Sequence, residues 1–191
     1  MTKVSFNISM SLDGFINGPD VTAEEGLGKG GERLHEWAFR GNERNREVLD
    51  SVHGIGAIIA GRRTYDLSVP WWGADGPTGE LRVPVFVVTH SVPDDVPEGG
   101  VYTFVTGGTE EALEQAKAAA GDKGVAVMGG ASIFRQYLAA GLLDEIGINL
   151  VPVLLGGGTR LFEDGEEQRQ LEPVEVIDTP LATHLRYRVA A

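Results

Sequence analysis

The sequence predicts an α/β fold whose central sheet is mostly parallel and carries an antiparallel C-terminal hairpin. Short apolar runs, typical of strands buried on both faces, alternate with segments of helical pattern. The chain then finishes with two strand-like segments around the turn signal Asp178-Thr179-Pro180. This alternation places helices on both faces of the sheet. With 191 residues and no internal repeat or linker tract, residues 1–191 are expected to form one domain.

The expected strands differ in their patterns. Residues 4–10 alternate apolar and polar side chains, as a half-buried strand does. Continuous apolar runs predict buried strands at 55–61, 85–89, 101–105 and 125–128, a long strand at 146–155 and a hairpin at 174–190.

Helical patterns occupy three segments between these strands. Residues 42–53 place Val48, Leu49 and Val52 on one face, and Gly54 ends the helix. Thr109 is expected to cap a helix that ends at Gly121, and residues 131–140 form a helix stopped by Gly141. The Gly-rich residues 21–41 are expected to be a mobile loop, and the Pro- and Trp-rich residues 68–84 an irregular excursion.

Composition excludes several classes of protein. A net charge of −12 argues against a nucleic-acid partner, which requires clustered Lys and Arg. No apolar run approaches the roughly 20 residues that span a bilayer, and no secretory signal pattern is present, so a cytoplasmic location is expected. Without cysteines there is no thiolate metal site, and His35, His53 and His184 lack metal-ligand spacing, so no metal is expected.

Three strand ends carry residues suited to a phosphate. The strand at 55–61 runs into Gly61-Arg62-Arg63-Thr64, the strand at 85–89 into Thr89-His90-Ser91, and the strand at 125–128 into Gly129-Gly130-Ala131-Ser132. Ligands of open α/β sheets bind at the carboxyl ends of strands. A glycine pair that opens a helix presents backbone N–H groups to a phosphate, and the arginine fork donates two hydrogen bonds at once.

Each of these signals has an ordinary alternative. A glycine pair after a strand is more often a tight turn, an arginine pair is more often solvated, and Thr-His-Ser is a common loop. The Gly-x-Gly-x-x-Gly fingerprint of the Rossmann fold is absent after the first strand. The three motifs gain weight from their order on successive strands.

That order resembles a known superfamily. Ser11-Leu12-Asp13-Gly14-Phe15-Ile16, then Gly61 to Tyr65, then Met128 to Phe134, and then Gly156 to Phe162 are similar to the dihydrofolate-reductase-like fold. The first loop looks most like the branch of riboflavin-biosynthesis reductases, the RibD C-terminal domain. The resemblance runs from the first strand to the last hairpin and implies a three-layer fold with NADPH as cofactor.

The resemblance also implies roles by position. Gly61, Arg62, Arg63 and Thr64 would hold the 2′-phosphate and pyrophosphate of NADPH, and Thr89, His90 and Ser91 would flank its adenosine. Gly129, Gly130, Ala131, Ser132 and Ile133 would supply donors for the pyrophosphate, Ile16 and Asn17 would lie near the nicotinamide, and Thr159 would help to close the site. The relatives' habit and the apolar strand at 146–155 suggest a homodimer.

The sequence departs from dihydrofolate reductase at the acid of the first helix. An ungapped count places Asn45 there, so dihydrofolate is not the expected substrate, and the nearby Glu43 and Glu47 are expected on a solvated face. Asp13 is the remaining candidate proton donor, although an Asp-Gly turn explains it equally well. Trp37 and Asn149 are candidate substrate contacts, with a core anchor as the alternative for Trp37. Trp71-Trp72 could stack on a substrate or serve a subunit contact.

The predicted function is hydride transfer from NADPH to a C=N or C=O bond of a small heterocyclic substrate, similar to a pteridine or a pyrimidine. The alternative is a protein of the same fold that binds NADP(H) without turnover. A riboflavin-pathway enzyme proper is a third, less favoured alternative, because the zinc-ligand cysteines of its deaminase are absent.

Overall fold

An eight-stranded sheet forms the centre of the protein in a computed structural model that describes residues 2–40, 43–165 and 167–190. The strand order is β4-β3-β2-β5-β1-β6-β8-β7. The six strands from β4 to β6 are parallel, whereas β8 pairs antiparallel with β6 and β7 pairs antiparallel with β8. The strands are β1 (Val4–Ser11), β2 (Ile55–Gly61), β3 (Val85–Val88), β4 (Tyr102–Val105), β5 (Gly124–Met128), β6 (Glu145–Val151), β7 (Leu171–Asp178) and β8 (Thr183–Val189).

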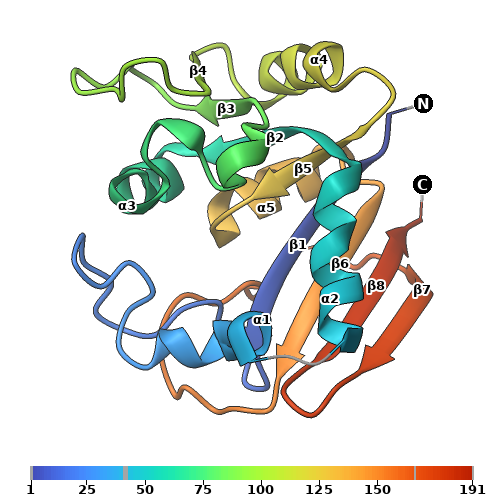
Figure 1. The fold of residues 1–191 in the computed structure, drawn as a ribbon. Helices are drawn as coiled ribbons and strands as arrows, with labels where there is room; N and C mark the ends of the chain where they lie inside the picture. Colours follow the sequence, from blue (N-terminus) through green and yellow to red (C-terminus); the bar gives the residue numbers. More distant parts are fainter. Residues whose placement is uncertain (1, 41–42, 166, 191) are drawn as a thin grey trace.

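Helices cover both faces of the sheet (Figure 1). They are α1 (Glu36–Arg40), α2 (Glu43–Asp50), α3 (Arg62–Trp72), α4 (Thr109–Ala120) and α5 (Ala131–Ala139). On one face, Phe6 and Ile59 pack with residues of α4 and α5. On the other face, Ile58 packs with Tyr65 of α3. Successive side chains of a strand point to opposite faces, so the apolar runs supply both layers, and the predicted α/β fold is confirmed.

Two segments that were expected to be irregular contain helices. Residues 68–72, the first part of the excursion expected at 68–84, belong to α3 (Arg62–Trp72), because Pro70 lies near the helix end and the lost N–H bond affects only its last turn. Within the Gly-rich segment, Gly31–His35 form a 3-10 turn that leads into α1. The rest of that segment is held by backbone bonds, among them Gly18 N–H to the Leu27 carbonyl (2.8 Å) and Lys29 N–H to the Pro19 carbonyl (2.8 Å). Both predictions were wrong in this respect.

Helix boundaries also differ from the predictions in detail. Thr109 is the first residue of α4 rather than its cap; Gly108 takes the cap position, and no side chain bonds there. The predicted helix at 42–53 is α2 followed by the 3-10 turn Ser51–Gly54. Leu49 is 38% exposed instead of facing inward. Asn42 and the side chain of Val52 lie outside the described residues.

The long strand predicted at 146–155 ends at Val151. The carboxylate of Asp13 accepts the N–H groups of Leu155 and Gly156, which therefore do not join a ladder. Moreover, β6 lies between β1 and β8, and its apolar side chains are buried within the chain except Leu150, which is partly buried. The strand that suggested a subunit contact is thus internal, and a homodimer stays a prediction.

The sheet divides at its centre. In the described residues, β1 pairs with β5 only over Val4, Ser5 and Phe6, whereas it pairs with β6 from Ser5 to Ser11. The carboxyl half of β1 therefore has a ladder partner on one side only. This division lies at the carboxyl edge of the parallel strands, where the strand order also changes direction.

None of the helices in the described part of the chain is long and apolar enough to cross a membrane.

Candidate cofactor and substrate site

Two helices begin side by side at the carboxyl edge of the sheet. Strand β2 leads through Gly61 into α3, and its neighbour β5 leads through Gly129 and Gly130 into α5. Neither helix has a side-chain cap at its N-terminus. The first N–H groups of a helix lack partners within the helix, and the helix dipole adds partial positive charge. The two ends together form a surface suited to an anion.

A close contact fixes the two helix ends relative to each other. The Gly130 N–H donates to Thr64 Oγ1 at 3.2 Å. A Cβ atom on Gly129 would lie 2.3 Å from the same oxygen, and Gly129 has φ +117°, a conformation that side-chain-bearing residues rarely adopt. The glycine at position 129 is therefore required for the two helices to approach. Thr64 acts here as a tie between α3 and the Gly129-Gly130 turn.

The two arginines at the start of α3 differ in their surroundings. Arg62 forms an ion pair with Asp66 (2.8 Å), and its Nη1 donates to Thr89 Oγ1 (3.2 Å) and to the Ser91 carbonyl (2.7 Å). Arg63 is exposed, and its side chain forms no hydrogen bond or ion pair within the described chain. Arg62 thus ties α3 to the loop after β3, whereas Arg63 remains available to a ligand.

The loop after β3 has a defined shape. Thr89 is buried, and its hydroxyl donates to the Ser91 carbonyl at 2.8 Å. His90 and Ser91 are exposed beside the start of α3. The three residues that the sequence assigned to the adenosine end thus adjoin Arg62, with Thr89 as the internal support.

The first loop pairs with the glycine-rich turn after β6. The Ile16 N–H donates to the Thr159 carbonyl (2.9 Å), and the Thr159 N–H donates to Asn17 Oδ1 (2.8 Å). A Cβ on Gly158, which has φ +126°, would lie 2.0 Å from the Asn17 carbonyl oxygen. Three residues that the sequence assigned to the cofactor, Ile16, Asn17 and Thr159, are therefore in direct contact across about 140 residues of chain.

Asp13 has a structural role in the same loop. Its carboxylate accepts the N–H of Leu155 (3.1 Å) and of Gly156 (2.8 Å). The Ser11 hydroxyl and these two backbone donors stabilise the charged form and lower the pKa of Asp13 to about 2. An ionised carboxylate at neutral pH has no proton to donate. This geometry favours the turn role over the proton donor.

The two candidate substrate contacts are buried. Trp37 is 6% exposed, donates from Nε1 to Ser9 Oγ (2.9 Å) and lies edge-on to His184. This position favours the core anchor over a stacking surface. Asn149 is 3% exposed and bonds to Asn7 and His184. It can therefore act on a ligand only through a neighbour.

Helix α2 carries no buried acid. Asn45 is 2% exposed and donates from Nδ2 to the Trp37 carbonyl at 2.7 Å. Glu43 and Glu47 are exposed, as expected of a solvated face. The residue at the inner face of α2 is therefore an amide.

Sequence reasoning missed a polar row on β1. Ser5, Asn7, Ser9 and Ser11 alternate with Phe6, Ile8 and Met10, so they share one face of the sheet. That face also carries Asn149 of β6 and His184 of β8, which are partners in the ladder. The available signal was the regular polar spacing in the first strand, which was interpreted only as half-burial.

The fold and the glycine-bounded helix ends define a dihydrofolate-reductase-like α/β protein. Dihydrofolate reductase from Enterococcus faecalis, solved with NADP(H), superposes with a TM-score of 0.60 at 16% identity and covers 99% of this chain and 97% of its own. Residues 2–184 match the model of the RibD C-terminal domain, and the chain belongs to this family.

Solved structures with names from riboflavin biosynthesis share this fold. One is a protein from Shewanella sp. PV-4 described as a putative riboflavin biosynthesis protein. It has a TM-score of 0.73 at 23% identity, and each chain is fully covered. The riboflavin biosynthesis reductase Rib7 of Saccharomyces cerevisiae has a TM-score of 0.63 at 18% identity, covering 99% of this chain and 90% of that one. At these identities the likeness concerns the fold.

Proposed function

We propose that this protein is an NADPH-dependent reductase that transfers a hydride to a C=N or C=O bond of a small heterocyclic molecule, similar to a pteridine or a pyrimidine. The observation that carries the proposal is the pair of helix N-termini without side-chain caps beside the exposed Arg63. Membership of the RibD C-terminal domain family, and the reductases that share the fold, support the same reaction class.

The residues of the carboxyl edge fit a dinucleotide phosphate. Uncapped N–H groups at Ala131, Ser132 and Ile133 suit a pyrophosphate, and Gly129 leaves the backbone accessible. Arg63 would bind the 2′-phosphate. Arg62 would hold the loop after β3 against α3, and Thr64 would hold the Gly129-Gly130 turn against the same helix. NADPH, when bound, supplies the hydride.

The chain's own contribution to the reaction is orientation and electrostatics. Ile16, Asn17 and Thr159 form a rigid wall where the nicotinamide would lie. Since Asp13 is ionised and Asn45 is an amide, we assign the proton to water. The same two observations favour a second candidate, a protein that binds NADP(H) without turnover.

The decisive experiment compares the two arginines. Because only NADPH carries the 2′-phosphate, wild-type protein should bind it about ten- to a hundredfold more tightly than NADH, corresponding to one charge-assisted contact of about 1.5–3 kcal/mol. Arg63→Ala should abolish this preference and leave the affinity for NADH nearly unchanged. Arg62→Ala should lower the affinities for NADPH and NADH by similar factors, since Arg62 holds the loop at Thr89 and Ser91.

Isothermal titration calorimetry of both cofactors measures these effects directly. Arg46→Ala is the matched control, because Arg46 is an exposed arginine on α2. The preference should also shrink as salt increases. Wild-type protein that binds neither dinucleotide would contradict both candidate functions. Binding without hydride transfer to any pteridine or pyrimidine tested would favour the second.

A further inference from the structure

An exposed asparagine lies where the sheet divides. Asn7 is in the middle of β1, one residue beyond Phe6, the last residue that pairs with β5. Its side chain shares a sheet face with Ser9 and Ser11, and with the buried Asn149 and His184. Beyond Phe6, β1 no longer pairs with β5, and the carboxyl end of β5 leads into the Gly129-Gly130 turn. Because Phe6 is the partner of Val127, Asn7 follows at the level of Met128, the last residue of β5 before that turn.

Two buried side chains fix the orientation of the Asn7 amide. Asn149 Nδ2 donates to Asn7 Oδ1 at 2.8 Å, and Asn149 Oδ1 lies 2.8 Å from His184 Nδ1. Because Asn149 uses its NH₂ group on Asn7, its oxygen must accept from His184, which therefore carries its proton on Nδ1. The hydrogen-bond chain leaves the NH₂ group of Asn7 as the free end.

A glycine makes room for this end of the chain. Gly147 is the ladder partner of Asn7 on β6, and a Cβ atom at Gly147 would lie 2.4 Å from Asn7 Nδ2. Within the described residues, Asn7 Nδ2 has no hydrogen-bond partner. An ordinary solvated asparagine needs no such support. Here a glycine, a buried amide and a buried imidazole all hold one exposed side chain.

The hydrogen-bond chain that holds Asn7 leaves a buried atom of His184 without a partner, which argues that the chain has a function. His184 is 4% exposed, and its Nε2 atom has no hydrogen-bond partner in the described part of the chain. A buried polar atom without a partner destabilises the folded protein, because it loses its hydrogen bonds to water and gains none in return. Burial also lowers the pKa of His184, so the ring is neutral and only one nitrogen can donate. That single donor is directed to Asn149.

We propose that Asn7 binds the substrate, by donating from its side-chain NH₂ group to a carbonyl oxygen or ring nitrogen of the heterocycle, and that Asn149 and His184 are positioning residues for it. This inference rests on the proposed function and adds the substrate's contact to it. An acceptor on the substrate would bind one of the two N–H donors of the Asn7 NH₂ group, which have no partner in the described residues.

Pterin is a suitable probe because it is a flat heterocycle with a lactam carbonyl. Binding of NADP⁺ is measured first by calorimetry, followed by titration of pterin into the saturated protein. Asn7→Asp keeps the acceptor for Asn149 but removes the donor, and should weaken pterin about tenfold while NADP⁺ affinity stays unchanged. Ser5→Ala, on the same strand and face, is the control and should change neither affinity.

The positioning role has its own readout. His184→Leu removes the donor to Asn149 and should weaken pterin, whereas His184→Asn places an amide donor near Nδ1 and should restore binding. Nitrogen-15 NMR of wild-type protein should show the proton of His184 on Nδ1, and pterin should shift the side-chain amide signal of Asn7. The NMR arm holds even if a variant fails to fold.

Two results separate this inference from the function beneath it. Absent NADP⁺ binding would contradict the proposed function itself. Normal NADP⁺ binding with an Asn7 amide signal that pterin leaves unmoved, or with pterin affinity indifferent to Asn7→Asp, would overturn the role of Asn7 and leave the reductase assignment intact.

Discussion

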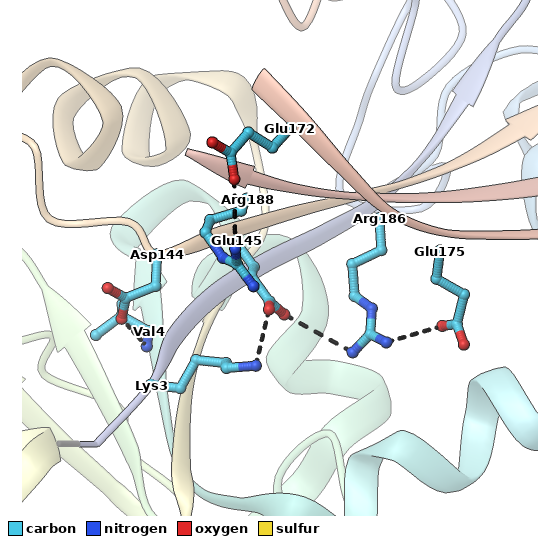
Figure 2. A network of polar contacts seen from close by, with 8 residues as sticks. All are labelled: Lys3, Val4, Asp144, Glu145, Glu172, Glu175, Arg186 and Arg188. Atoms are coloured by element: carbon cyan, nitrogen blue, oxygen red, sulfur yellow. Dashed lines mark hydrogen bonds and ion pairs between the residues drawn. The ribbon is translucent and has the colours of Figure 1, made fainter. Parts of the chain in front are cut away.

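The amino and carboxyl edges of the parallel sheet differ in whether their charged and polar groups have partners within the protein. At the amino edge, Lys3, Glu145, Arg186 and Glu175 form a continuous series of ion pairs that joins β1, β6, β8 and β7 (Figure 2). At the carboxyl edge, Arg63 and the first N–H groups of α3 and α5 have no hydrogen-bond partner in the described chain, and the NH₂ group of Asn7, in the middle of β1, has none either. The charges that stabilise the fold are paired, and the donors that we assign to ligands are not.

The C-terminal hairpin shows the structural use of charge most clearly. Glu172 pairs with Arg188 (3.3 Å) and Glu175 with Arg186 (3.0 Å) across β7 and β8 (Figure 2). β7 is an edge strand with Pro173 and an irregular register beside it. Proline, charge and irregularity at an edge all discourage pairing with another chain. This edge is thus protected, in contrast to the open donors of the site.

The largest effect is expected from a substitution at the contact between the Gly129-Gly130 turn and α3. Gly129→Ala introduces a Cβ atom that would lie 2.3 Å from Thr64 Oγ1, at φ +117°. We expect the free energy of unfolding to fall by about 2–3 kcal/mol, from backbone strain and the displaced Thr64, and NADPH affinity to fall at least tenfold. Chemical denaturation and calorimetry measure the two quantities.

The matched control for this change lies at the other end of α5. Gly141 also has a positive φ (+66°), but a Cβ atom there would meet nothing within 4 Å. Gly141→Ala should cost about 1–2 kcal/mol of stability from the left-handed backbone alone, with cofactor affinity unchanged. Equal loss of NADPH affinity in both variants would show that general destabilisation, rather than the Thr64 contact, is responsible.

A smaller effect is expected at the amino edge. Glu145 is 6% exposed and accepts from Lys3 at 2.8 Å, with Arg186 at 3.8 Å. Glu145→Gln removes the charge between two cations that are themselves about half exposed, so we expect a loss of about 1–2 kcal/mol in the free energy of unfolding. NADPH affinity measured on the same preparation should not change. A cofactor defect here would remove the division between a structural and a binding edge.

The smallest effect is the pH dependence that Asp13 contributes. Its pKa is about 2 in the folded protein against an ordinary 3.8, because Ser11 and two backbone N–H groups stabilise the carboxylate. A lowered folded-state pKa adds stability above pH 3.8, which is lost as the pH falls toward 2. Asp13→Asn should therefore lose less in melting temperature than wild type between pH 4 and pH 2. Parallel curves over that range would contradict the structural role of Asp13.

The sequence alone determined the order of elements and the place of the site. Strongly apolar runs give buried strands wherever they occur, so β2, β3, β4 and β5 were predicted to within about one residue of their bounds. Parallel strands bring their carboxyl ends to one edge, so the motifs at Gly61, Thr89 and Gly129 had to meet. The local sequence pattern is enough to predict such strands, because a short apolar segment that is buried on both faces can adopt few other structures.

Only the tertiary structure decided what each polar residue does. Arg62 and Arg63 are equivalent in sequence, and they differ because the loop at Ser91 lies within reach of one and not the other. Asp13 is a turn residue because Leu155 and Gly156, more than 140 positions away, present their N–H groups to it. Trp37 and Asn149 are buried beside a histidine from the last strand. Side-chain roles depend on partners that are distant in sequence, and no local pattern encodes those partners.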